Sequence, residues 1–283
     1  VASTAAMEDG TGLCEFKKRY PDRFFDVEIA EQHALTMAAG MAKFGLKPVV
    51  PIYSSFLQRG YDQIVHDIAL QKLGVVICVD RAGIVGTDGE THQGLLDLAF
   101  LNTIPNMTIM SPKNYEELEM MLEFSLKQNK PIAIRYPRGE EEFKFKKSKI
   151  IEDGKAEILK SGSDVTILAI GKMTSTAMEV SKLLKKENID SEVINARFMK
   201  PLDIDSIQKS IDKTKLLITL EDGNVSCGFG EKVKSNIKGK VISLGYPDKF
   251  IEHGKPKELF KKYGMDSESI YKIIKDIFDK KIV

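Results

Sequence analysis

Short apolar runs alternate with longer amphipathic stretches along the first half of the chain. The apolar runs are typical of buried strands, and the amphipathic stretches have helical spacing. The runs lie at residues 47–53, 74–80, 107–110 and 131–136, and the helical stretches at residues 30–44, 60–72 and 115–128. Strands that alternate with helices predict a mostly parallel sheet with helices on both faces.

A charged segment at residues 139–149 interrupts this pattern and is expected to run over the surface. The alternation then restarts and predicts a second α/β unit. Its strands are predicted at residues 164–170, 191–195, 216–220 and 240–244, and its helices at 175–187, from about 203, and at 256–263 and 268–279. We therefore predict two consecutive three-layer α/β/α domains with mostly parallel sheets, residues 1–145 and 146–283.

Composition narrows the classes of function. The 283 residues fit two domains. The 42 basic and 41 acidic residues give a net charge of +1, which argues against nucleic acid and membrane surfaces as partners. No apolar run approaches the roughly 20 residues of a membrane span. The three cysteines are far apart and the four histidines form no metal motif, so we expect free thiols, no bound metal and a cytoplasmic protein.

Charged side chains follow three of the predicted strands. Arg59 follows the first, Arg81 the second and Arg138 the fourth, and the loop after Arg81 adds Asp88 and His92. Ligands of open α/β sheets bind at the carboxyl ends of strands. Arginines suit a phosphate or carboxylate, and a histidine suits proton transfer. Each residue alone is more often part of a surface ion pair, and the shared location favours a functional site.

Glu31 stands in the first turn of a helix whose next residues, 34–42, are apolar nearly all round. Such a helix is expected to be buried. The carboxylate can simply complement the helix dipole. A carboxylate that leads a buried helix is unusual, so a functional role stays open.

Five segments occur in the order known from one enzyme family. They are Phe25-Asp-Val-Glu-Ile-Ala-Glu-Gln-His33, residues 52–63, residues 80–94 (which begin with Asp80-Arg-Ala-Gly), Arg135-Tyr-Pro-Arg-Gly139, and residues 195–203. They resemble the 1-deoxy-D-xylulose-5-phosphate synthase family of transketolase-like enzymes, and the similarity extends over essentially the whole chain.

The resemblance implies a thiamine-diphosphate enzyme that condenses pyruvate with glyceraldehyde 3-phosphate and releases CO₂, in isoprenoid precursor and thiamine biosynthesis. It makes residues 1–145 a pyrimidine-binding domain and residues 146–283 a transketolase C-terminal domain. Family members carry a further N-terminal domain that binds the diphosphate through Mg²⁺. The chain begins without Met or a signal peptide. We therefore expect the Mg²⁺ ligands in a missing N-terminal domain, no activity without it, and a homodimer.

By the same resemblance, Glu31 bonds to the pyrimidine ring of the cofactor, and we expect it to be buried. Phe56 matches the aromatic residue that stacks on this ring, and Arg59 an arginine beside it. Glu31 is also expected to act in catalysis, because it stabilises the proton on the ring nitrogen. Gln32 and His33 stay ambiguous, as does His66.

The resemblance also implies the residues that bind the acceptor. Tyr53, Arg81 and Arg138 match the group that holds the sugar phosphate. Asp88 and His92 match residues near the acceptor hydroxyl and aldehyde, with His92 as the proton shuttle.

Two further patterns carry less weight. Asp88-Gly89 and Asn114 have roughly the spacing of a thiamine-diphosphate metal site, but Thr87 precedes Asp88, so we assign no metal there. Cys227-Gly-Phe-Gly230 lacks the third glycine of a dinucleotide fold, and we expect a tight turn.

Two alternatives remain. The chain can be a natural separate subunit of a split transketolase or an E1β-type enzyme, which an upstream reading frame would reveal. It can also be a non-catalytic regulatory protein on the same fold, although such relatives usually lose their charged loop residues.

Overall fold

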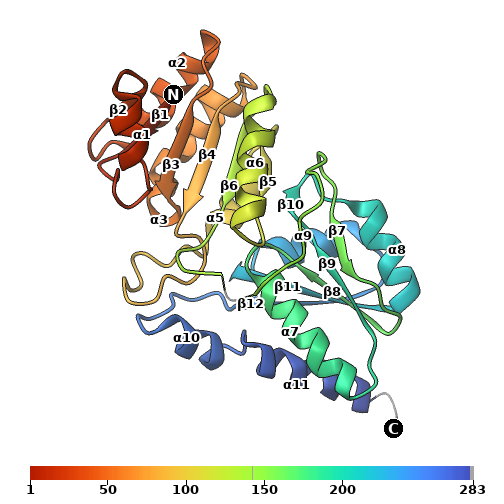
Figure 1. Cartoon of the computed structure of the whole chain (residues 1–283). Coiled ribbons are helices and arrows are strands. Elements are labelled where there is room, and N and C mark those ends of the chain that lie inside the picture. Colours follow the sequence, from red (N-terminus) through yellow and green to blue (C-terminus); the bar gives the residue numbers. More distant parts are fainter. Residues whose placement is uncertain (142, 281–283) are drawn as a thin grey trace.

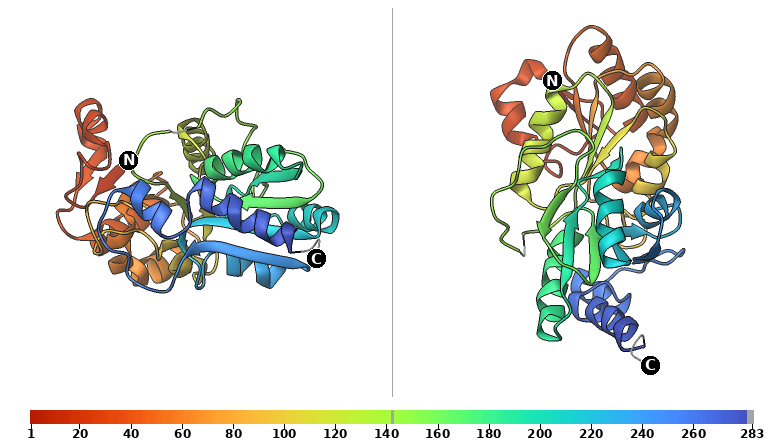
Figure 2. Two further views of the ribbon diagram at one scale, coloured as in Figure 1. Left: turned by 90° about the horizontal axis from the view of Figure 1, so that it is seen from below. Right: turned by 90° about the vertical axis from the view of Figure 1, so that its right-hand side faces the viewer.

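The computed structural model describes residues 1–141 and 143–280. The chain folds into two β-sheets with helices on their faces (Figure 1). The right-hand view of Figure 2 shows the half with the N-terminus above the half that ends at the C-terminus. The predicted pair of consecutive, mostly parallel α/β units is confirmed.

The first sheet has seven strands in the order β10-β5-β6-β4-β3-β1-β2. Each pair of neighbours is parallel except β10 and β5. The strands are β1 (Ala2–Thr4), β2 (Phe24–Asp26), β3 (Val49–Tyr53), β4 (Val76–Asp80), β5 (Thr108–Met110), β6 (Ile132–Arg135) and β10 (Phe198–Lys200).

Helices cover both faces of the first sheet. On β4, Ile77 and Val79 pack with Leu35 of α2, whereas Val76 on the opposite face packs with Met121 of α6. The helices of this half are α1 (Cys14–Arg19), η1 (Pro21–Arg23), α2 (Glu31–Lys43), α3 (Ser54–Leu57), η2 (Gln58–Gly60), α4 (Tyr61–Gln63), the π-helix η3 (Ile64–Ala69), α5 (Asp97–Asn102) and α6 (Tyr115–Lys127).

The second sheet has five strands in the order β12-β11-β8-β9-β7, with only β7 antiparallel to its neighbour. Helices α7, α10 and α11 pack on one face, and α8 and α9 on the other. The elements are β7 (Glu157–Lys160), β8 (Val165–Ala169), α7 (Met173–Lys186), β9 (Ser191–Asn195), α8 (Ile204–Thr214), β11 (Leu216–Asn224), α9 (Phe229–Asn236), β12 (Lys240–Tyr246), α10 (Pro256–Lys262) and α11 (Ser267–Asp279).

One strand passes from the second half into the first sheet. β10 follows β9 along the chain, yet it pairs with β5, so that Phe198 lies opposite Met110. The apolar core is also continuous, because one buried cluster contains both Ile77 of β4 and Leu217 of β11. The boundary at residue 145 stays a prediction; it lies between β6 and β7.

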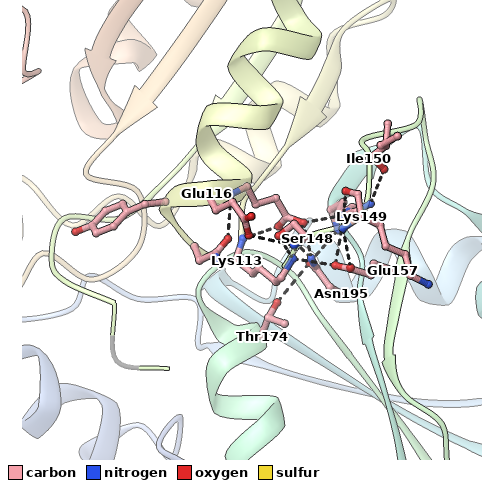
Figure 3. A network of polar contacts seen from close by, with 12 residues as sticks. Lys113, Glu116, Ser148, Lys149, Ile150, Glu157, Thr174 and Asn195 are labelled. Carbon is pink, nitrogen blue, oxygen red and sulfur yellow. Dashed lines mark hydrogen bonds and ion pairs between the residues drawn. The ribbon is translucent and has the colours of Figure 1, made fainter. Parts of the chain in front are cut away.

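A buried polar network joins the two halves (Figure 3). Lys113 Nζ donates to Glu117 Oε1 (2.9 Å) and to Glu157 Oε2 (2.8 Å). Arg197 Nε donates to Glu117 Oε1 (2.8 Å), and Arg197 Nη2 lies 3.1 Å from Glu157 Oε2. The Asn195 amide donates to both oxygens of Glu117 (3.1 and 3.0 Å). Two cations and two carboxylates therefore neutralise each other away from water.

The apolar pattern identified the longer strands and missed several short elements, among them β2, β7, β10, α1, α5 and α9. Residues 139–141 and 143–149 form neither helix nor strand, as predicted for a connecting segment. None of the helices in the described ranges is both long and apolar enough to cross a membrane.

Candidate active site

The predicted site residues belong to loops after three neighbouring strands. β3, β4 and β6 lie side by side in the first sheet and run in parallel. Arg59 follows β3, Arg81 follows β4 and Arg138 follows β6. The three arginines therefore start from the same edge of the sheet, where ligands of α/β proteins bind.

Glu31 begins α2 with its side chain buried. The residue is only 3% exposed. Arg59 Nη1 lies 3.1 Å from Glu31 Oε2, but this contact is an ion pair without hydrogen-bond geometry, and Oε2 has no hydrogen-bond partner. A buried carboxylate oxygen that accepts no hydrogen bond costs free energy. Glu31 therefore presents an acceptor that a ligand's N–H group would satisfy.

Tyr53, Phe56 and His92 form a row of ring contacts. The Tyr53 and Phe56 rings stack with centroids 5.5 Å apart and an interplanar angle of 17°. The Phe56 and His92 rings meet edge to face at 5.2 Å. The guanidinium carbon of Arg81 lies 3.7 Å from the centroid of Tyr53, within cation–π distance. These contacts connect Phe56, which is predicted to stack on the cofactor, with Tyr53, Arg81 and His92, which are predicted to bind the acceptor.

Arg81 is held in place by its neighbours. Its Nη1 donates to the carbonyl of Gly10 (2.9 Å) and lies 3.4 Å from Asp80 Oδ1. Asp80 Oδ1 also accepts the backbone N–H of Arg81 (2.7 Å). Burial raises the pKa of Asp80, and the positive charge of Arg81 opposes that rise. Because Arg81 has a left-handed φ of 53°, the bonds to Asp80 help to hold a strained backbone.

Asp88 and Arg138 pair with each other. Arg138 Nη1 donates to Asp88 Oδ2 at 3.0 Å, with both side chains partly exposed. Burial raises the pKa of Tyr53, and the charges of Arg81 and Arg138 oppose this while those of Asp80 and Asp88 add to it. All four charged groups therefore act electrostatically on the Tyr53 hydroxyl.

Asp88 and His92 lie on one closed loop, the 83–94 loop. Its base is an antiparallel bridge in which Gly83 and Gly94 exchange backbone hydrogen bonds of 2.6 and 2.8 Å. Inside it, Gln93 Oε1 accepts the N–H groups of Val85 (2.9 Å) and Gly86 (3.3 Å). The loop is therefore an internally bonded unit.

Two cavities lie beside the site residues. One of about 540 Å³ is lined by residues near α3, by the 83–94 loop and by residues 248–251. The other, about 290 Å³, includes Arg138, Lys172 and Pro256. Of the predicted site residues, only Arg138 lines either cavity, so neither cavity is by itself the predicted cofactor site.

The weaker sequence patterns have local structural roles. Asn114 Oδ1 accepts the N–H of Glu117 (3.0 Å) and caps α6. Gly228 donates to the carbonyl of Val225 (3.1 Å), which forms the predicted turn and leads into α9. Within residues 1–141 and 143–280, no three His, Cys, Asp or Glu side chains gather as a metal site.

The roles of His66, His33 and Gln32 were left ambiguous by the sequence, and side-chain contacts do not assign them to the site. His66 Nδ1 bonds to Asp62 Oδ1 (2.8 Å) within the exposed part of its helix. His33 is exposed and Gln32 half-buried on α2. None of these contacts joins the ring row or the Glu31–Arg59 pair.

Sequence reasoning missed Asp80 and Gln93, which hold Arg81 and the 83–94 loop. It also missed Asp222, which approaches this loop from the second sheet. A signal was present in the glycines at both ends of the loop, because a glycine often marks a close approach of another group to the backbone.

Comparisons with known proteins show the family of the chain. Residues 1–142 match the family model described as transketolase, pyrimidine binding domain, and residues 154–270 match that of the transketolase C-terminal domain. A protein from Clostridium tetani named 1-deoxy-D-xylulose-5-phosphate synthase is 52% identical over 277 residues, which are 96% of this chain and 45% of that protein. A protein of the same name from Halothermothrix orenii is 47% identical over 295 residues, covering the whole chain and 46% of the relative.

A solved structure is similar in fold. It is titled a split gene transketolase, inactive beta4 tetramer, with a TM-score of 0.89 and 29% identity, and the match covers 98% of this chain and 91% of that one. By contrast, the chain spans less than half the length of the two named synthases. It belongs to the transketolase family, and in sequence it corresponds to the C-terminal part of 1-deoxy-D-xylulose-5-phosphate synthases, with a pyrimidine-binding and a C-terminal domain.

Proposed function

We propose that the chain supplies the pyrimidine-binding half of a thiamine-diphosphate site, together with the acceptor-binding loops, in a transferase of the 1-deoxy-D-xylulose-5-phosphate synthase type. In this reaction pyruvate loses CO₂ and its remaining two carbons join glyceraldehyde 3-phosphate. Identity of about half the residues to proteins of that name supports the proposal. The observation that carries it is the buried Oε2 of Glu31, which accepts no hydrogen bond.

The residues present fit the aminopyrimidine ring of the cofactor. Thiamine diphosphate, when bound, supplies the nucleophilic carbon and the electron sink. Glu31 Oε2 is placed to accept a proton shared with a ring nitrogen, and its burial strengthens that bond. Phe56 offers a half-buried ring three residues before Arg59, which contacts Glu31. We assign the diphosphate and its Mg²⁺ ion to a diphosphate-binding domain outside this sequence, because the relatives are about twice as long.

The loops after β4 and β6 are suited to a phosphorylated aldehyde. Arg81 and Arg138 offer planar donor groups to phosphate oxygens, and Tyr53 offers a hydroxyl on whose pKa both charges act. His92 is half-buried against Phe56 and is assigned to proton transfer at the aldehyde. Asp88, on the same loop, is assigned to the acceptor hydroxyl. We expect the assembled enzyme to be a homodimer.

The test joins a diphosphate-binding domain to this chain and measures CO₂ release from pyruvate with glyceraldehyde 3-phosphate. Activity that requires thiamine diphosphate is expected. Glu31→Gln is expected to lower it by about 10²- to 10⁴-fold, the range of acid–base effects. Glu28→Gln, an exposed neighbour, is the matched control. Full activity of Glu31→Gln would contradict the proposal.

The chain alone provides a second test. Titration calorimetry is expected to show no tight, Mg²⁺-dependent binding of thiamine diphosphate, because half of the site is absent. Tight binding by this chain alone would overturn the division of the site between two domains.

A natural split enzyme is the second candidate. It is favoured by the similarity to the split-gene transketolase, because the match covers 91% of that chain but only 45% of a synthase. The reading frame upstream of this sequence discriminates between them. A separate gene with a diphosphate-binding motif supports a split enzyme, and a continuous frame supports the synthase.

A further inference from the structure

We propose that Asp222, which belongs to β11 of the second sheet, is a positioning residue for the 83–94 loop. The second half of the chain would then determine where Asp88 and His92 lie. The consequence for catalysis rests on the proposed function, in which Asp88 and His92 contact the acceptor substrate.

Asp222 packs directly against the base of the loop. The residue is 1% exposed, and its Oδ1 accepts the backbone N–H of Ile84 at 3.2 Å. A Cβ atom on Gly83 would lie 2.0 Å from Asp222 Oδ2. Gly83 also has a φ of +83°, which L side chains rarely adopt. Only glycine at this position therefore allows the carboxylate to reach the loop backbone.

The other side of the loop base is held by Arg135 at the end of β6, which also contacts Asp222. Arg135 Nη2 donates to the carbonyl of Gly94 (3.3 Å) and also to the carbonyl of Asp222. Arg135 Nε is fixed by both oxygens of Asp97 (3.0 and 2.8 Å). Both strands of the Gly83–Gly94 bridge are thus tied to β11, one through the Asp222 side chain and one through Arg135.

The second half also contacts the loop at two further residues, Gln93 and Gly86. Gln93 Nε2 donates to the carbonyl of Glu252 (3.0 Å), and the N–H of Gly254 points to the carbonyl of Gly86 (3.3 Å). In Figure 1 the loop after β4 extends toward the segment that precedes α10. A loop with contacts to the second half at its base and at two further residues moves with that half. His92 therefore keeps its contact with Phe56 only while those contacts persist.

The experiment measures hydrogen exchange and the His92 ring resonances in this chain, without cofactor or substrate. Asp222→Ala removes the acceptor of the Ile84 N–H, and Asp222→Asn keeps an acceptor oxygen of the same size. Asp203→Ala is the matched control: Asp203 is a buried carboxylate of the same half that accepts the N–H groups of Ala156 (3.0 Å) and Ser206 (3.3 Å).

Exchange in Asp222→Ala is expected to rise by about tenfold or more in residues 84–92, because a hydrogen bond to a charged acceptor contributes roughly that factor. The His92 resonances should shift as the ring leaves Phe56. Asp222→Asn should restore both. Unchanged loop exchange, or a uniform rise of the kind expected for Asp203→Ala, would overturn the proposal.

If Asp222→Ala does not fold, Gln93→Glu is measured in its place, since it keeps an acceptor oxygen for the N–H groups of Val85 and Gly86 but removes the donor to the Glu252 carbonyl. A rise confined to the loop supports positioning by the second half, and an unchanged loop overturns it. Because no readout involves thiamine diphosphate, failure here leaves the proposed function standing. Absence of turnover in the assembled enzyme would likewise leave the exchange result valid.

Discussion

Arg197 and Glu117 pair between the two halves of the chain, with Arg197 Nε 2.8 Å from Glu117 Oε1 and both residues at most 2% exposed. Burial removes water from both charges, so each depends on the other for compensation. Lys113 and Glu157 complete the group. Burial alone would raise the pKa of Glu157. The hydrogen bond from Lys113 and the charge of Arg197 outweigh burial and lower this pKa. The contact between the halves therefore contains a charge-balanced core.

Removing one member of this group should destabilise the protein strongly. Arg197→Met leaves Glu117 and Glu157 short of one positive charge, and the free energy of unfolding is expected to fall by about 3–5 kcal/mol. Urea denaturation measures the loss. Lys18→Met is the control, because it breaks an exposed pair with Glu15 at 2.9 Å and should cost at most about 1 kcal/mol. Equal losses in the two variants would argue against a structural role of the network.

Stability is expected to fall as the pH rises from about 4.5 to about 7, because of Glu221. Burial raises its pKa to about 7, although the N–H groups of Gly230 and Phe229 oppose the rise. The folded protein thus holds this proton more tightly than the unfolded chain. Its contribution favours folding below about pH 4.5 and is lost progressively up to about pH 7, by about 3 kcal/mol at most.

Unfolding measured from pH 5 to 8 tests the role of Glu221. Glu221→Gln is expected to flatten the fall in stability, since the amide does not titrate. Glu179→Gln is the control, because Glu179 is an exposed carboxylate on α7 of the same half. A pH profile of Glu221→Gln that is identical to the parent's would show that other groups cause the dependence.

Arg81→Lys should weaken recognition of the phosphate. Lysine keeps the charge but loses the planar group that lies over Tyr53 at 3.7 Å. In the assembled enzyme the KM for glyceraldehyde 3-phosphate is expected to rise by about 10- to 100-fold, with a smaller change in kcat. Unphosphorylated glyceraldehyde is the control substrate, for which the change should be small. Equal effects on both substrates would exclude phosphate as the group that Arg81 binds.

Two glycines should respond oppositely to alanine. Gly40 is exposed within α2 and an added Cβ meets no atom within 4 Å, so Gly40→Ala should raise the free energy of unfolding by about 0.5–1 kcal/mol. At Gly60 the added Cβ would lie 2.2 Å from Leu35 Cδ1, so Gly60→Ala should lower it. Thermal denaturation of both variants provides the comparison, and stabilisation by Gly60→Ala would contradict the packing of α2 against η2.

Much of the fold could be predicted from the sequence, because its strands are buried on both faces and read as continuous apolar runs. β4 and β11 are examples. β10 could not be predicted in this way. Its three residues are too few to show a hydrophobic pattern, and it forms a strand because it pairs with β5. Helix α9 was also missed, because it follows a glycine-rich turn that interrupts the apolar pattern.

The sequence predicted where the candidate site lies, but not which of its side chains pair with each other. The rule for strand ends put Arg59, Arg81 and Arg138 at one edge of the sheet. It could not show that Arg59 turns to Glu31 while Arg138 turns to Asp88, since such choices depend on side-chain positions in three dimensions. Their assignment as binding and catalytic residues stays a prediction.

The passage of β10 into the first sheet bears on how such a protein can be divided. A cut in the connecting segment would free the N-terminal unit as a chain but would strip β5 of its antiparallel neighbour. The bare hydrogen-bonding groups of β5 would then form an open edge of the kind that recruits foreign strands and promotes aggregation. The three residues of β10 belong to the second unit by sequence and to the first by structure. The two units can therefore be separated or recombined, in evolution or by engineering, only if another strand replaces β10.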